Sequence, residues 1–71
     1  MTIITVDDLC EENVERTLCI GVCSDNKTTK AIILYTDVRA KHSWFEILVD
    51  AKYYGSFIEI GECVREYNLI E

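Results

Sequence analysis

The sequence predicts an α+β fold. We expect a three- to four-stranded antiparallel sheet, a C-terminal amphipathic helix packed on one face, and a short acidic N-terminal helix. Two observations predict it: β-rich runs separated by turn-forming residues fill the middle of the chain, and apolar residues recur at intervals of three and four near its end. The 71 residues include no proline and no Gly/Ser-rich linker, so a single domain over residues 1–71 is expected.

The first hairpin is predicted around the turn sequence at 24–27. Asp25 and Asn26 in this turn tolerate a left-handed backbone. Pairing about the turn places Val22 opposite Thr29, Ile20 opposite Ala31, and Leu18 opposite Ile33. Both faces of this hairpin are then partly apolar, which is typical of strands that are covered on two sides or that take part in association.

A second hairpin is predicted over 42–57, with the chain reversing at 50–52. Aromatic and aliphatic residues of this hairpin are expected to share one face, where cross-strand pairs stabilise a sheet. They are Trp44, Leu48, Tyr53 and Phe57.

The two ends of the chain carry helix signals. Ser56 and Glu59 form a Ser-x-x-Glu sequence that predicts the start of the C-terminal helix. Its core side is expected to be Phe57, Ile60, Val64 and Tyr67, and Asn68 its end. Near the N-terminus, Thr5 and Asp8 match the same capping pattern for a helix of about eight residues that stops near Asn13. Strand and helix remain alternatives over residues 2–9.

Charge is distributed unevenly. Thirteen acidic and seven basic residues give a net charge of −6, and residues 1–15 contain five acids and no base. Such a protein is repelled by nucleic acid and attracted to basic surfaces, so no direct nucleic-acid binding is expected. No apolar run approaches the ~20 residues of a membrane span. The first fifteen residues lack the pattern of a secretory signal, and we expect a cytoplasmic location and no membrane partner.

Catalytic, cofactor and metal motifs are not found in the sequence. The four cysteines are Cys10, Cys19, Cys23 and Cys63, and none of them forms a Cys-x-x-Cys pair. The single histidine, His42, is distant from all of them along the chain. We therefore expect free thiols, no bound metal, no cofactor and no enzymatic activity.

The acidic residues near both ends are the leading candidate for a binding surface. On a helix, their spacing approximates a sparse track of phosphates, although charged faces of helices are often only solvated. The candidate residues for contact with a basic partner are Glu59, Glu62, Glu66, Asp7, Asp8, Glu11 and Glu12, and the candidate aromatic anchors are Tyr54 and Trp44.

The C-terminal pattern of "WFEILVD", "AKYYGSF" and "SFIEIGECVREYNL" resembles a strand–turn–strand–helix unit of small phage and mobile-element proteins. In size, acidity and architecture, the chain also resembles the anti-CRISPR kind of phage counter-defence inhibitor. The resemblance covers about residues 44–68 and implies a stoichiometric inhibitor that occupies a nucleic-acid-binding groove or blocks a contact on a host complex.

Two alternatives belong to other classes. One is a homo-oligomerising structural subunit that uses the outer face of the first hairpin, with Cys19, Ile32 and Leu34 at its interface. The other is a small-ligand or nucleic-acid binder, because a segment of the chain places basic residues beside an aromatic. Its residues are Arg39, Lys41, His42 and Trp44.

Overall fold

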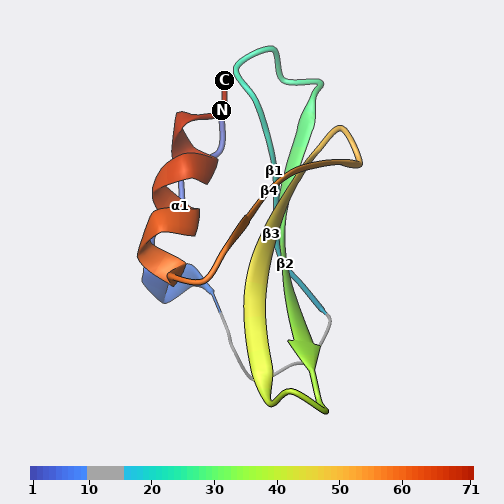
Figure 1. Ribbon diagram of the computed structural model, residues 1–71. Coiled ribbons are helices and arrows are strands. Elements are labelled where there is room, and N and C mark those ends of the chain that lie inside the picture. Colours follow the sequence, from blue (N-terminus) through green and yellow to red (C-terminus); the bar gives the residue numbers. More distant parts are fainter. Residues whose placement is uncertain (10–15) are drawn as a thin grey trace.

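The computed structural model describes residues 1–9 and 16–71. The elements are a 3-10 turn η1 (Val6–Asp8), strands β1 (Arg16–Val22), β2 (Thr29–Asp37), β3 (His42–Val49) and β4 (Lys52–Phe57), and helix α1 (Ile60–Leu69). The four strands form one antiparallel sheet in the order β1-β2-β3-β4, and α1 lies across one of its faces (Figure 1). This confirms the predicted α+β class. We call the face under α1 the inner face and the opposite one the outer face.

The inner face of the sheet provides one side of the core. Ile32, Leu34, Phe45 and Ile47 are buried there against α1. The helix contributes the buried side chains of Cys63, Val64 and Tyr67, and Ile4 completes the cluster. The predicted core side of the helix is therefore confirmed at Val64 and Tyr67, and Ile60 packs against it only partly buried.

The first hairpin has the predicted register near its turn and departs from it farther away. Val22 lies opposite Thr29 and Ile20 opposite Ala31, but Thr17 rather than Leu18 lies opposite Ile33. The predicted pairing of Leu18 was wrong because the register shifts between Thr17 and Cys19. An extra residue in one strand rotates the side chains that follow it, and Leu18 packs against the core as a result.

The second hairpin also contains a shift, which separates residues expected to share a face. Leu48 pairs with Tyr53, whereas Ile47 pairs with Gly55, so Tyr54 is the extra residue of β4. Phe57 then lies opposite Phe45, on the inner face. The prediction that Phe57 shares a face with Tyr53 was wrong, because the bulge reverses the alternation between them.

The start of α1 also differs from the prediction. Ser56 belongs to β4, and its hydroxyl lies 2.9 Å from that of Tyr53. The helix begins at Ile60, with Glu59 as its N-cap residue and no hydrogen bond from that side chain to the helix. The Ser-x-x-Glu sequence was misleading because β3 pairs with β4 as far as Phe57 and keeps Ser56 extended.

The N-terminal segment runs beside β1 before it reaches η1. The Thr2 N–H donates to the Val22 carbonyl, and the Val22 N–H donates to the Thr2 hydroxyl, each at 3.0 Å. A Cβ at Gly21 would lie 2.6 Å from that hydroxyl oxygen, so only glycine permits this approach. The Thr5 N–H then donates to the Asp8 carboxylate, as the capping pattern predicts.

Only one turn of the predicted N-terminal helix falls within the described residues. It is the 3-10 turn η1, and residues 2–4 before it are not helical. The turn ends at Asp8, since Leu9 is already extended with φ −99° and ψ 138°, so the helix predicted to continue through Leu9 was wrong at that residue. Residues 10–13 of the predicted helix, with its expected end at Asn13, lie outside the described residues. Both chain ends lie at the same end of the molecule, where the Ser24 N–H donates to the Glu71 carbonyl (Figure 1).

Candidate functional site

Carboxylates from two distant parts of the chain lie in one layer of the molecule. Asp7 and Asp8 are exposed in η1, and Glu59 and Glu62 are exposed at the start of α1. Glu66, one turn farther along α1, is half-buried. We call these five residues the acidic layer. Of the other predicted contact residues, Glu11 and Glu12 lie outside the described residues.

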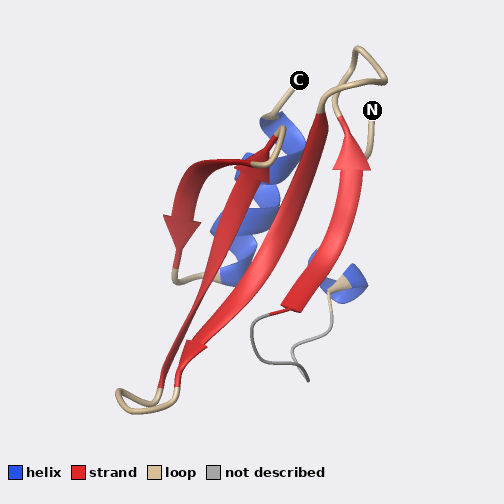
Figure 2. Ribbon diagram, turned by 90° about the vertical axis from the view of Figure 1, so that its right-hand side faces the viewer, coloured by secondary structure: helices blue, strands red, loops and turns tan. Residues whose placement is uncertain are grey.

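An amide on α1 holds the N-terminal segment in this layer. The Asn68 side chain accepts from the Ile4 N–H and donates to the Ile4 carbonyl, each at 2.9 Å. From Ile4 the segment runs antiparallel to α1, so η1 lies near the helix start, where it contacts α1 (Figures 1 and 2). The predicted end of the helix at Asn68 thus proves to be the residue that joins the two acidic segments.

Basic groups lie mostly away from the acidic layer. Arg65 is the only basic residue of α1. The other bases whose side chains the structure describes are at the strand turns or in the core: Lys27, Arg39, Lys41, Lys52 and Lys30. None of the side-chain hydrogen bonds found in residues 1–9 and 16–71 involves the carboxylates of the α1 acids, and Asp8 bonds only to Thr5. Asp7, Asp8, Glu59 and Glu62 are thus exposed, and no hydrogen bond within the described residues joins them to a base.

Lys30 occupies the core beneath the end of α1, a role that the sequence analysis did not assign to it. The residue is 0% exposed. Its ammonium donates to the Tyr67 carbonyl at 2.8 Å and to the Ile70 carbonyl at 3.3 Å, and lies 4.3 Å from the centre of the Tyr67 ring. Desolvation lowers the pKa of Lys30, and its contacts are those of a helix C-cap. Lys30 and Ile32 are two residues apart in β2, so the alternation of the strand places both side chains on the same face. This alternation was the signal from which the burial of Lys30 could have been predicted.

The thiols near Lys30 are suited to packing. Cys19 is half-buried, Cys23 and Cys63 are buried, and all three are free. Burial raises the pKa of the Cys63 thiol to about 12 and also raises the pKa of Cys19, so both remain protonated near neutral pH. In the described part of the chain, no three His, Cys, Asp or Glu residues form a group that could hold a metal ion.

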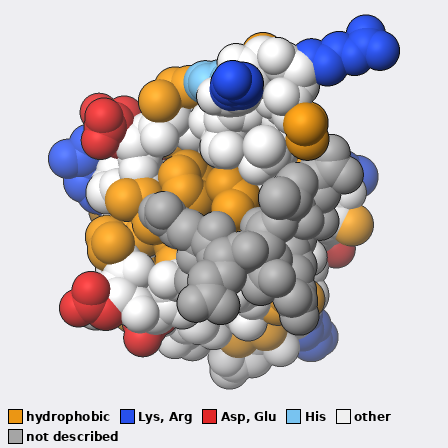
Figure 3. Space-filling model, turned by 90° about the horizontal axis from the view of Figure 1, so that it is seen from below, with side chains coloured by type: hydrophobic (Ala, Val, Ile, Leu, Met, Phe, Trp, Pro, Cys, Tyr) orange, Lys and Arg blue, Asp and Glu red, His pale blue; other side chains and the backbone are white. Residues whose placement is uncertain are grey.

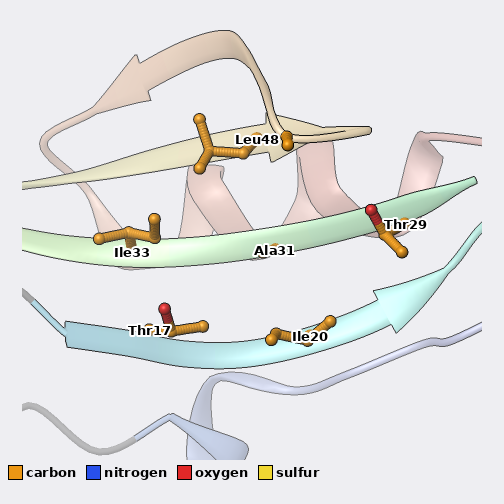
Figure 4. Close-up of a pocket in the computed structure, with 7 residues that line it drawn as sticks. Thr17, Ile20, Thr29, Ala31, Ile33 and Leu48 are labelled. Carbon is orange, nitrogen blue, oxygen red and sulfur yellow. The ribbon is translucent and has the colours of Figure 1, made fainter.

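The middle of the outer face of the sheet is mostly apolar, and no described element covers it. Ile20 projects from it with 69% of its surface exposed. Beside Ile20 is a shallow hollow of about 310 Å³ across β1, β2 and β3 (Figure 4). The residues that line it are Thr17, Ile20, Thr29, Ala31, Ile33, Leu48 and Ala51.

The expected interface residues of the first hairpin were assigned to the wrong face. Ile32 and Leu34 are buried under α1, and Cys19 packs against the same core. Alternation along the strands correctly grouped these residues together. Tertiary packing decides which of the two apolar faces the helix covers, and α1 covers the face that bears Ile32 and Leu34.

The residues considered for small-ligand or nucleic-acid binding lie at the end of the sheet formed by the β2–β3 turn. Trp44 stacks between His42 and Tyr35, with both ring-centre distances 5.7 Å, and its indole N–H donates to Glu46 at 2.8 Å. Arg39 and Lys41 are exposed in or beside the β2–β3 turn. The Trp44 ring and its N–H are thus already engaged within the chain.

Of the two predicted aromatic anchors, Trp44 does not join the acidic layer. Trp44 lies on the outer face. It pairs with Tyr35, which is two residues from Ile33 along β2, and side chains two residues apart on a strand share a face. Ile33 lines the hollow. Tyr54 is exposed on β4. One flat partner could not contact Trp44 and the helix carboxylates together. Figure 3 shows the end of the molecule opposite the chain termini, where some hydrophobic side chains are visible beside the undescribed residues and charged side chains lie at the rim.

Comparisons with known proteins give no family assignment. No protein-family model, curated protein or solved structure matches the chain. Within the described residues, no helix is long and apolar enough to cross a membrane.

Proposed function

We propose that this chain is a non-catalytic protein-binding inhibitor whose acidic layer occupies a basic, nucleic-acid-binding surface of a partner protein or nucleoprotein complex. The observation that supports it is the gathering of Asp7 and Asp8 with the α1 glutamates in one layer, with Arg65 as the only base on the helix. A partner that binds nucleic acid presents the lysines and arginines that such a layer attracts.

Charge alone would give a weak complex, because exposed ion pairs contribute only about 0–1 kcal/mol each. Apolar residues near the acidic layer can supply the desolvated centre of the contact. Ile58, just before α1, is 65% exposed, Leu69 at its end is 66% exposed, and Val6 in η1 is also exposed. They take the place of Trp44, which lies on the outer face, and Tyr54 remains a predicted contact.

The partner can be sought by affinity capture from the cell that makes the protein or that it enters, with elution on a salt gradient. The resemblance to counter-defence inhibitors makes nucleic-acid-binding defence complexes the first candidates. With a partner in hand, we expect the affinity to fall as salt rises, because screening shortens the reach of exposed charges. We also expect the bound partner to lose affinity for its nucleic acid.

A matched pair of double variants tests which carboxylates are responsible. Glu59→Gln with Glu62→Gln removes two charges from the acidic layer, and we expect it to weaken binding by about 0.5–2 kcal/mol. Asp37→Asn with Asp50→Asn removes two charges from the strand turns and should leave affinity unchanged. Equal affinity at low and high salt, together with no effect of the Gln substitutions, would refute the proposal.

A further inference from the structure

We infer that the outer face of the sheet binds the same face of a second copy, giving a two-fold dimer with the two sheets in contact and the helices outside. This inference is independent of the acidic layer and its partner. It rests on the shape, charge and extent of the outer face, which nothing covers within the described chain.

The shape of the face is self-complementary. Ile20 on β1 projects into solvent, and directly beside it lies the hollow over Ala31 and Ile33 (Figure 4). In a two-fold interface, if residue i of one copy contacts residue j of the other, then j of the first contacts i of the second. A projecting side chain next to a recess meets this condition, because each Ile20 can enter the hollow of the other copy.

Charge favours a second copy over the basic partner proposed for the acidic layer. The described residues that line the hollow are all uncharged. Among the outward-facing residues at the middle of the sheet, only Glu46 carries a charge, and it accepts a hydrogen bond from Trp44. A basic surface would find little to pair with here. Two copies that meet at this face would hold their acidic layers on opposite sides of the dimer, which limits the repulsion between chains of net charge −6.

The extent of the face suits a weak but specific interface. Four strands at a spacing of ~4.8 Å, each with about seven residues rising ~3.3 Å, span roughly 20 by 23 Å. Side-chain relief adds to this flat area, so two copies together approach the lower limit of ~1,200 Å² for a stable interface. Burying apolar surface in this way also compensates for the small core that a chain of 71 residues can form.

Sedimentation of the full chain from low micromolar to near-millimolar concentration tests the inference. We expect a reversible shift from monomer to dimer mass as concentration rises. Ile20→Lys should hold the chain at monomer mass over the same range. Because this change makes the net charge less negative, loss of the dimer would report on the outer face itself and not on a general rise in repulsion between the copies.

The matched control is Ile58→Lys, the same substitution at a residue 65% exposed beside α1, which should dimerise like the wild type. Ile33→Thr keeps a β-branched residue in β2 and should also weaken the dimer, and circular dichroism checks that each variant is folded. A wild-type chain that remains monomeric at every concentration would overturn the inference, and so would a dimer that Ile58→Lys disrupts and Ile20→Lys does not.

Discussion

Lys30 shows how one side chain can connect the sheet to the helix. It is on a central strand, and its ammonium bonds to two carbonyl groups at the end of α1 while facing the Tyr67 ring. The Tyr67 hydroxyl bonds in return to the Lys30 carbonyl at 3.3 Å. A buried charge is costly unless its hydrogen bonds are made, and here the helix end supplies the acceptors.

Two substitutions at Lys30 separate packing from capping. Lys30→Ala removes both the aliphatic stem and the donors, and we expect it to lower the free energy of unfolding by about 2–4 kcal/mol. Lys30→Met keeps most of the stem, so its loss should be smaller and should report mainly on the cap. Urea unfolding of both variants measures the difference. If the Met variant is more stable than the wild type, desolvation of the ammonium outweighs its bonds, contrary to our expectation.

At the scale of elements, the β3–β4 turn contains a local conflict. Asp50 and Ala51 have φ values of 53° and 63°, the left-handed geometry that a two-residue hairpin turn requires. The Asp50 N–H donates to the Thr29 carbonyl at 2.8 Å, which ties the turn to β2. Aspartate tolerates this backbone, whereas a Cβ at the alanine position is disfavoured.

Ala51→Gly should relieve that conflict. We expect a gain of about 0.5–1 kcal/mol in the free energy of unfolding, because the left-handed penalty of alanine exceeds the added entropy of an unfolded glycine. Ala40→Gly, in the β2–β3 turn, is the matched control. Since Ala40 has no positive φ, glycine there should be slightly destabilising. Thermal unfolding of both variants decides the point, and a loss of stability in Ala51→Gly would contradict our interpretation of the turn.

For the molecule as a whole, the core contains several groups whose neutral form the fold favours. Burial raises the pKa of Cys63 from 9.0 to about 12, and it raises the pKa values of Cys19 and Tyr67. The unfolded pKa values are 9.0 for the two cysteines and 10.0 for the tyrosine. The contribution of each group to stability is complete below its unfolded pKa and is lost as the pH rises through its pKa in the folded protein. Lys30 acts in the opposite sense, because desolvation lowers its pKa below 10.5.

We therefore expect a net loss of stability above pH 9, since three such acids oppose one base. The slope can reach about 1.4 kcal/mol per pH unit for each buried acid. Urea unfolding at a series of alkaline pH values tests this, and Cys63→Ala should reduce the slope. Tyr53→Phe, at an exposed position, serves as the control. A free energy of unfolding that stays constant above pH 9 would disprove the expectation.

Local sequence determined much of this protein. Turn residues placed both hairpins, and the spacing of Val64 and Tyr67 identified the core side of α1. It also fixed the uneven distribution of charge, because composition does not depend on folding. These features depend on contacts within a few residues of one another, where propensity and periodicity apply directly.

Tertiary structure decided the rest. The bulges at Leu18 and Tyr54 reversed the alternation, and pairing with β3 kept Ser56 out of the helix. Both faces of the first hairpin were apolar enough to be covered, and only the docking of α1 selected the one that bears Ile32 and Lys30. The acidic layer likewise depends on a bond between Ile4 and Asn68, 64 residues apart. Such choices are made by packing between distant segments, which no local pattern records.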